Sequence, residues 1–406
     1  MKCKYSFFFK DSRGSATVML AILMFAFVGL LAFVIDLAHL QNVKTELWNA
    51  ADDCALRGAR AFLPDNLPLN DQLLKINPDP NRAVSQASLA IGDNRSDDNA
   101  FHMANLIDLP AGDIQSGIWD YKGEVTGKIQ LIMPWQWPPD QNTMWGKYIG
   151  PGITLPVKRD DTHNRGQVSM TLARIFKVNQ VAVGANATAA LSGVGGVYPG
   201  SPVLPFGTWD NQLPPPGNTL HGTFNVDQSD TLGWTNLNPK DTNPNANELK
   251  TIMNQGALYD CPYGSTVGLQ NGVASTVIQA MTQQAKGKNP LNRFGLIPDP
   301  NSTGKNEFIP SPDPNPASPG DTYASTVYMM PVFSDGSHGG DKYNQSAVVG
   351  GVPVQIVRVA DSPGNYIDVL VVGGPYVAPG YGGGRWYGVL ATEPKLVGDL
   401  SQYRGY

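Results

Sequence analysis

The chain has 406 residues, a formal net charge of −5 and only 16% charged residues. The acidic balance and the lack of any Lys/Arg-rich block argue against nucleic acid as a partner. The 44 glycines and 33 prolines indicate many short strands joined by turns rather than long helices.

The chain begins with a segment that is long and apolar enough to cross a membrane. Residues 16–35 read ATVMLAILMFAFVGLLAFVI, and about 20 apolar residues is the length that a helix needs to span a bilayer. Basic residues precede this run and the next one is Lys44, so the positive-inside bias predicts a cytoplasmic N-terminus. A cleaved signal peptide and a buried core helix are the alternatives, but a signal peptide usually has a shorter apolar part and a small-residue cleavage site. Asp36 follows at the exit end, where we expect the headgroup region to hydrate its carboxylate.

The helix is predicted to continue out of the membrane. Small and apolar residues recur along one face at intervals of three and four. We call these residues the stripe: Leu40, Leu47, Ala51, Cys54 and Gly58. Small residues permit close helix approach in lipid, so the stripe could contact a partner helix, and packing against the protein's own strands is an equal alternative. The helix should end before Leu63-Pro64, because proline disfavours helical geometry in the residue before it.

The rest of the chain is predicted to be an α+β, strand-rich exported region. Helices are expected at residues 82–91 and 273–285. Strands are expected at residues 113–119, 127–133, 168–172, 181–191, 323–333, 348–359 and 366–372. Segments 199–216, 236–247 and 298–320 are rich in Pro, Asn, Gly and Asp, which predicts loops. The Gly- and Tyr-rich tail from residue 373 is interpreted as a peripheral edge.

These patterns divide the chain into five parts. They are a cytoplasmic N-terminus (1–15), a transmembrane helix (16–36), an exported helix that continues the span (37–63), a first strand-rich region (64–196) and a second strand-rich region with Pro/Gly-rich loops (197–406).

Two of the three cysteines are expected on the exported side. Cys54 and Cys261 would lie in an oxidising compartment, where an even number of cysteines invites a disulfide. The alternative is that Cys54 is simply a buried helix residue. Zinc-type Cys/His spacings are absent from the sequence.

Motifs for catalysis, cofactors and metals are nearly absent. The sequence has no G-x-S-x-G nucleophile motif, and its histidines are scattered singly: His39, His102, His163, His221 and His338. Residues 302–305 have the tail of a P-loop, but Asp299 stands where the first glycine is required, so no nucleotide site is expected. Acidic clusters at 93–98 and 335–341 are interpreted as solvated loops rather than cation sites. We therefore expect no enzyme activity, no cofactor and no metal.

The N-terminal segment carries several features that occur in a fixed order. They are Arg13 and Gly14 before the aliphatic span, Asp36 at its exit, and an NAAD-type helix at Asn49–Asp52. The strings AVSQASLAIGDN, DIQSGIWD and QVSMTLARIFKVNQVAVGANATAAL follow. In this order the chain resembles TadE/TadG-like proteins of the bacterial tight-adherence (Flp/Tad) pilus system, whose larger TadG-like members have a strand with G-x-W-D, a further strand, a short helical crossing and a strand ending in Ala-Thr-Ala. Met19 holds the place of the glutamate that prepilins carry, so we expect the N-terminus to be retained.

The resemblance implies a membrane-anchored structural or assembly component of a pilus or related secretion apparatus, acting through protein-protein contacts. It implies the bacterial inner membrane, with the bulk of the chain in the periplasm or at the cell surface and other pilus or secretion proteins as partners. The candidate contact residues are Arg13 and Gly14 at the entrance, Asp36 at the exit, and the stripe. An anchored periplasmic binding or sensing module is one alternative, and an anchored exported hydrolase is another, which the missing catalytic motifs disfavour.

Overall fold

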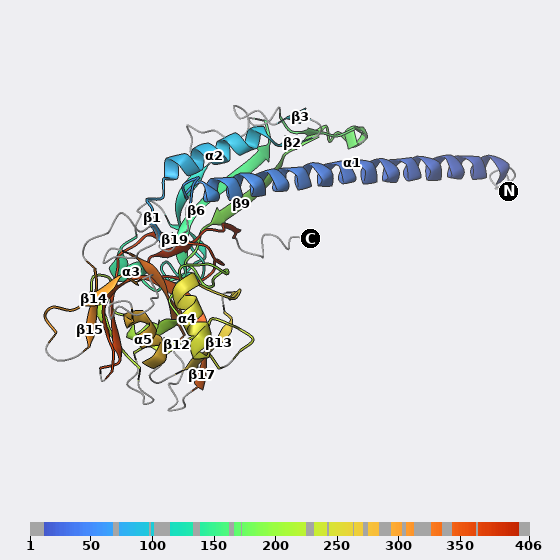
Figure 1. Ribbon diagram of the computed structural model, residues 1–406. Helices are drawn as coiled ribbons and strands as arrows, with labels where there is room; N and C mark the ends of the chain where they lie inside the picture. Colours follow the sequence, from blue (N-terminus) through green and yellow to red (C-terminus); the bar gives the residue numbers. More distant parts are fainter. Residues whose placement is uncertain are drawn as a thin grey trace, which may run out of the picture. The chain divides into compact units, whose positions relative to one another are not determined.

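The computed structural model has the α+β composition that the sequence predicts (Figure 1). One long helix comes first, and strands dominate from residue 115 onward. The structure describes residues 12–67, 73–96, 99–100, 114–132, 139–161, 166–171, 173–224, 231–241, 243–262, 264–270, 275–283, 294–302, 306–311, 326–334, 343–362 and 364–397.

The chain forms two compact units that interleave along the sequence. The first comprises Met1–Cys54, Ser88–Ile114 and Leu155–Ala187, and the second comprises Ala55–Ala87, Gln115–Thr154 and Thr188–Tyr406. The predicted division into five consecutive parts stays a prediction.

The transmembrane and exported helices of the sequence prediction form one continuous helix, α1 (Ser12–Arg60). The helix ends before Pro64, as predicted, with Ala61 and Leu63 donating backbone hydrogen bonds to Arg57 and Arg60 at 3.0 Å. Arg57 and Arg60 lie in the last turn, where cations interact favourably with the negative end of the helix dipole.

The second predicted helix is α2 (Pro80–Gly92). Its start follows from two local features. Pro80 occupies the first helical position, where its missing N–H costs no hydrogen bond. Asp79 precedes it, and its carboxylate accepts a hydrogen bond from the Asn81 N–H at 2.9 Å. The buried face of α2 carries alanines, Ala83 and Ala87 among them, so another element can approach it closely.

A five-stranded sheet contains three of the predicted strand segments. Its order is β22 (Lys395–Leu396), β9 (Val183–Ala190), β6 (Ile149–Arg159), β4 (Gln115–Asp120) and β5 (Gln130–Ile132). The antiparallel pairing of β4 with β6 runs from Gln115 opposite Thr154 to Asp120 opposite Ile149. The predictions at 113–119 and 127–133 correspond to β4 and β5, and most of the prediction at 181–191 corresponds to β9.

The long strand β6 was not predicted, because its sequence begins IGPGITLP and reads as a turn. Two glycines allow this strand to lie close to its neighbours. A Cβ atom on Gly150 would lie 1.7 Å from the Leu191 carbonyl oxygen, and one on Gly152 would lie 3.1 Å from the Trp119 Cβ. Only glycine therefore permits the backbone of β6 to approach residue 191 this closely.

A ten-stranded sheet forms the framework of the second unit. In spatial order its strands are β11 (Thr219–Thr223), β18 (Tyr366–Val371), β17 (Tyr343–Ala360), β13 (Thr266–Gln270), β12 (Gly233–Trp234), β10 (Phe206–Trp209) and β16 (Tyr328–Phe333), with β14 (Leu296–Pro298), β15 (Glu307–Pro310) and β20 (Arg385–Trp386) off this path. The 18-residue strand β17 pairs with β13, β15, β16, β18 and β20. The predicted strands near 323–333, 348–359 and 366–372 thus correspond to β16, β17 and β18.

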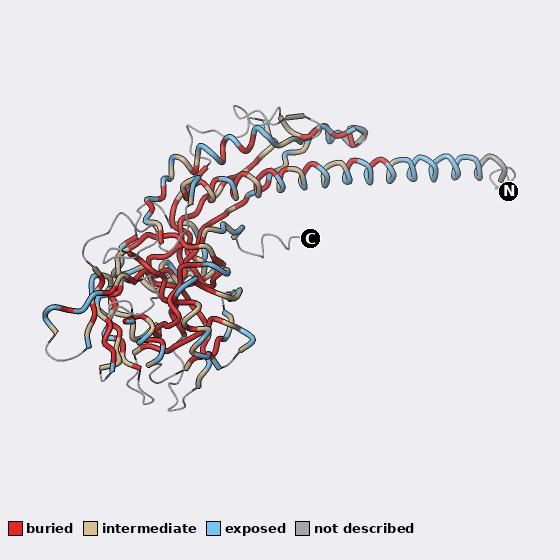
Figure 2. The backbone as a smooth tube through the Cα atoms, viewed as in Figure 1, coloured by how far each residue is buried: buried red, intermediate tan, exposed pale blue. Residues whose placement is uncertain are grey.

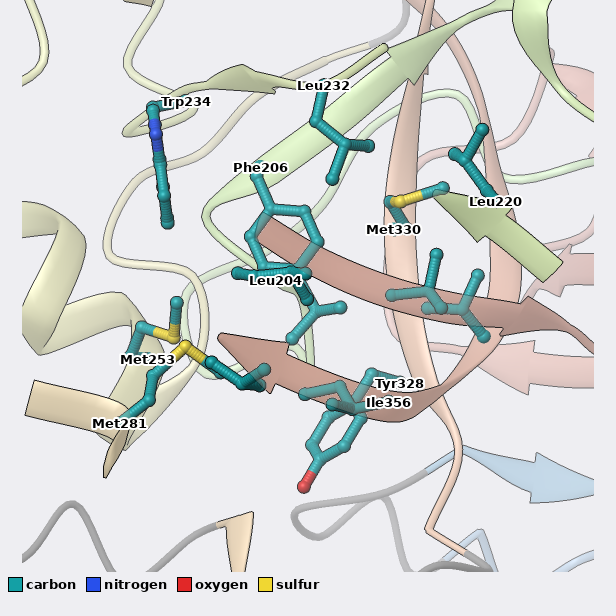
Figure 3. Close-up of a cluster of buried hydrophobic side chains, with 14 of the residues drawn as sticks. Leu204, Phe206, Leu220, Leu232, Trp234, Met253, Met281, Tyr328, Met330 and Ile356 are labelled. Atoms are coloured by element: carbon teal, nitrogen blue, oxygen red, sulfur yellow. The ribbon is translucent and has the colours of Figure 1, made fainter. Parts of the chain in front are cut away.

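The main core of the second unit lies against this sheet. It includes Phe206, which packs edge-to-face on Trp234 at 5.5 Å between ring centroids, while Phe224 stacks on Trp234 at 4.4 Å. Two helices complete the core, α4 (Ala246–Gln255) and α5 (Ser275–Thr282), the second of which lies within the predicted helix at 273–285. Figure 3 shows Phe206 beside Leu204, and Met253 of α4 close to Met281 of α5.

The described part of the C-terminal tail, residues 373–397, is not a peripheral edge, and for this part the prediction is wrong. The strands β1 (Leu74–Lys75), β19 (Tyr376–Ala378) and β21 (Val389–Ala391) form a three-stranded sheet. Val377, Leu390 and Trp386 are fully buried. A glycine-rich composition favours exposure, but here the absence of a side chain allows close contact: a Cβ on Gly193 would lie 2.2 Å from the Arg385 carbonyl oxygen.

Two of the predicted loops contain regular structure. Segment 199–216 includes β10 and the 3₁₀ turn η4 (Asp210–Gln212), and segment 298–320 includes β15. β10 pairs in parallel with β16, Thr208 opposite Val332. The prolines around it suggested a loop, because pairing with strands far along the chain cannot be inferred from local composition. Other described elements are β2 (Arg95–Ser96), β3 (Asn99–Ala100) and α3 (Gln141–Met144).

Candidate functional site

The large side chains of the apolar part of α1 are exposed in the structure. From Val18 to Ile35 every large apolar side chain is at least 56% exposed, and Figure 2 shows this part of α1 in pale blue. Among the described residues, α1 is the one helix long and apolar enough to cross a membrane. Removing a large apolar side chain from water is worth about 1.5–3 kcal/mol, so this surface strongly favours a lipid environment. Arg13 and Gly14 belong to the first turn of α1.

Asp36, the predicted exit residue, is buried by the protein itself. Its side chain is only 1% exposed. One carboxylate oxygen accepts a hydrogen bond from the Thr171 backbone N–H at 3.0 Å, and the other accepts one from the Ala173 N–H. The expectation that lipid headgroups hydrate this carboxylate is therefore wrong. Backbone amides of a segment 135 residues away replace the water.

The segment bound to Asp36 is a short hairpin, which we call the Asp36 hairpin. It consists of β7 (Val168–Ser169), the 3₁₀ turn η3 (Ala173–Phe176), β8 (Gln180–Val181) and the described residues between them. β7 and β8 pair antiparallel. The Met170 N–H donates to the Asn179 carbonyl at 2.9 Å, and the Val178 N–H donates to the Ala173 carbonyl at 3.2 Å.

The sequence prediction of a strand over 168–172 is therefore too long, since the strand ends at Ser169. The chain turns at this point to bring two amides onto Asp36. Lys177 adopts a positive φ of 66° to bring the chain back into β8. The conformation is costly for a residue with a Cβ.

The stripe is largely buried along the part of α1 that follows the apolar run. Leu47, Ala51 and Cys54 are fully buried and Leu40 is half-buried. At Gly58 a Cβ would lie 2.9 Å from Ile153 Cδ1 of β6 and 3.0 Å from Ala87 Cβ of α2. Of the two alternatives for the stripe, Gly58 supports packing within the protein. A role of the stripe in contacts with a partner stays a prediction.

The aspartate of the G-x-W-D string organises a loop. Asp120 is fully buried at the end of β4. Its carboxylate accepts hydrogen bonds from the backbone N–H groups of Lys122, Glu124, Val125 and Thr126 at 2.8–3.3 Å. These bonds close the turn that follows β4, so the aspartate of this string has a structural role in the chain.

A polar and aromatic cluster in the second unit was not predicted. Asp210 accepts hydrogen bonds from the Arg385 guanidinium and from the Tyr387 hydroxyl. Trp145 packs edge-to-face on Trp386 and on Tyr387, with ring centroids 5.7 and 5.8 Å apart. Burial, followed by the hydrogen bond to Asp210, raises the pKa of Tyr387. Because the partners are about 175 residues apart in the chain, no local pattern could have found them.

His221, interpreted from sequence as one of several isolated histidines, has a partner. It lies opposite Asp368 in the pairing of β11 with β18. The distance from His221 Nδ1 to Asp368 Oδ1 is 2.6 Å, and the imidazole lies 4.8 Å from the Tyr366 ring. The side chain of His221 is 62% exposed, which is typical of a surface pair. His102, His163 and His338 lie outside the described residues.

Both cysteines that are predicted to be exported, Cys54 and Cys261, are buried. Cys54 belongs to the first unit and Cys261 to the second. Burial raises the pKa of the Cys261 thiol to about 12, so this group stays protonated and unreactive at neutral pH. A bridge between the two stays a prediction. Within the part of the chain that the structure describes, no group of three or more His, Cys, Asp or Glu side chains could hold a metal ion.

Comparison with known proteins supports the resemblance seen in the sequence. Residues 14–61 match the family described as putative Flp pilus-assembly TadE/G-like. The match begins at Gly14, includes Asp36 and the whole stripe, and ends one residue after α1. No curated protein and no solved structure matches the chain.

Proposed function

We propose that this protein is a membrane-anchored structural or assembly component of a Tad-type (Flp) pilus or a related secretion apparatus, and that it acts through protein-protein contacts rather than catalysis. The observation that carries the proposal is the coincidence of the TadE/G-like match with α1. The matched residues include the exposed apolar span and the aspartate that binds the protein's own hairpin. A pilus-related role follows from the match, and the mode of action is our inference.

The proposed location is the bacterial inner membrane, with a cytoplasmic N-terminus and the bulk of the chain in the periplasm or at the cell surface. The basic residues before the span support this orientation, and the exposure of the large apolar side chains between residues 18 and 35 supports insertion in the membrane. Membrane fractionation and protease protection should find the protein in inner membranes with residues beyond Asp36 accessible from the outside. Mass spectrometry should find residues 1–15 retained. A mature protein that starts at Ser15 would contradict the retained N-terminus, and one that starts after Ile35 would contradict the anchor.

Contacts made within the membrane can be tested without disturbing the exported fold. Residues 18–28 of α1 are all exposed, so replacing all of them by leucine keeps an apolar span and removes its particular surface. In cells that lack the native gene, we expect this variant to insert normally and to fail in pilus display. The wild-type chain at matched expression is the control. Normal pilus display in cells that lack the protein altogether would refute the proposed function.

A further inference from the structure

The Asp36 hairpin lies at the level where the apolar span ends. Residues 16–35 are about as many as a helix needs to cross the hydrocarbon core. Asp36 follows immediately, and its carboxylate holds the Thr171 and Ala173 amides. The end of the hairpin is therefore attached to α1 at the boundary between the acyl chains and the headgroups.

One face of the last turn of the span is covered, while the rest is exposed. Ala32 lies one helical turn before Asp36 on the same face, and it is 1% exposed. Its neighbours Leu31 and Phe33 are 59% and 56% exposed. Figure 1 shows the short green segment at β7–β8 beside the middle of α1, in agreement with the hydrogen bonds to Asp36. The hairpin thus lies beside a part of α1 whose other faces carry exposed apolar side chains.

The composition of the hairpin fits a membrane interface. From Gly166 to Val181 the chain has two basic residues, Arg174 and Lys177, and no acidic residue. Both basic residues are exposed, and Val178 beside them is 43% exposed. Basic side chains with long apolar stems, next to exposed apolar side chains, are typical of segments that lie in the headgroup layer.

We propose that the Asp36 hairpin lies in the headgroup layer of the outer leaflet of the membrane that α1 crosses, and that Arg174 and Lys177 bind anionic phospholipid headgroups there. Asp36 is the positioning residue, since it fixes the hairpin to α1 at the depth where headgroups begin. The inference rests on the proposed function in one respect, the insertion of α1 in a bilayer. Beyond the span, the hairpin would supply a second contact with the membrane, at its interface, and this contact would fix the depth of α1 in the bilayer.

The test measures the depth of single labelled cysteines in the full-length protein, reconstituted in vesicles. Cys3 is first replaced by serine, while Cys54 and Cys261 are buried and can stay. A fluorophore is then attached to one new cysteine, which is Val178→Cys in the hairpin, Phe25→Cys in the span or Leu89→Cys in α2. Leu89 is a matched control in the same unit, since it is 54% exposed. Leu89 lies near the end of α2. Asn94, two residues after this helix, donates a side-chain hydrogen bond to the Asp53 carboxylate of α1 at 3.2 Å. Asp53 is 17 residues beyond Asp36, about 25 Å along the helix.

Nitroxide-labelled lipids then report the depth of each position. With the nitroxide on the headgroup, we expect quenching at residue 178 and none at residue 89. With the nitroxide deep in the acyl chains, we expect quenching at residue 25 alone. Absence of quenching at residue 178 with normal quenching at residue 25 would overturn the inference and leave the anchor intact. Absence of quenching at residue 25 would instead refute the anchor on which the proposed function rests.

Two further comparisons test the roles assigned to the residues. Asp36→Asn should reduce quenching at residue 178 without changing quenching at residue 25. Arg174→Gln with Lys177→Gln should lower quenching at residue 178 in vesicles that contain phosphatidylglycerol, and should have little effect in vesicles of phosphatidylcholine alone. Inorganic phosphate is then added to phosphatidylcholine vesicles. If it raises quenching at residue 178 as much as phosphatidylglycerol does, the site binds free anions and the membrane assignment is wrong.

Discussion

Gly58 is where the packing of α1 can be tested most directly. A leucine there must fit its Cβ into a space where Ile153 Cδ1 lies at 2.9 Å, Ala87 Cβ at 3.0 Å and the Ala83 carbonyl oxygen at 3.2 Å. The three further carbons of leucine have no room beyond that point. Overpacking of this kind costs about 1–3 kcal/mol or more, while replacing a glycine in the last turn of a helix gains at most about 0.5–1 kcal/mol, the helix propensity that applies in a helix interior. We expect a net destabilisation of about 1–2 kcal/mol.

The assay is thermal unfolding of the full-length protein in nanodiscs, together with pilus display at matched expression. Gly58→Leu should lower both the Tm and the level of pilus display. Gly58→Ala should have a much smaller effect on each, because only the Cβ is added. Gly92→Leu is the matched control, since no atom lies within 4 Å of a Cβ at that helical glycine. If Gly58→Leu lost pilus display with an unchanged Tm, the glycine would serve a contact with a partner and our packing argument would fail.

Three further predictions concern the other residues singled out above. Asp36→Ala leaves the buried N–H of Ala173 without an acceptor, at about 1–3 kcal/mol, and also removes the acceptor of the part-buried Thr171 N–H, so hydrogen exchange at residues 168–181 should accelerate; unchanged exchange would show that the carboxylate does not hold the hairpin. If Cys54 and Cys261 form a bridge in the oxidising compartment, they should resist alkylation in denatured, non-reduced protein and react after reduction, whereas labelling of both before reduction would reject the bridge. His221→Ala removes an exposed pair that is worth about 0–1 kcal/mol, so pilus display should persist; its loss at normal protein levels would indicate an unrecognised catalytic or binding role.

The elements predicted with success are those whose signal is local. The apolar run and the three-and-four spacing of small residues predicted α1 as far as Pro64, and β-branched runs predicted β16, β17 and β18. The elements that were missed, such as β6 and β10, contain or adjoin glycine and proline. They are strands because distant segments pair with them, and local propensity carries no information about such partners.

The same distinction applies to the candidate site. Asp36 could be singled out from the sequence, because a carboxylate directly after an apolar run is unusual. Its role could not, since the amides of Thr171 and Ala173 reach it only through tertiary packing. Likewise, the small residues of the stripe were visible in the sequence, while the structure showed that Gly58 packs against α2 and β6.

The sequence by itself determined that the chain has a membrane-spanning candidate helix with a TadE/G-like character, because length, hydropathy and residue spacing along one helix are properties of contiguous residues. Tertiary structure alone decided which backbone N–H groups donate hydrogen bonds to the Asp36 and Asp120 carboxylates. It also decided why glycine is required at residues 58 and 150, and that the described part of the tail from residue 373 contributes to the core. The physical reason is that a buried polar or charged group must find its hydrogen-bond partner wherever the fold brings one, and close packing depends on the shapes of segments distant in the chain.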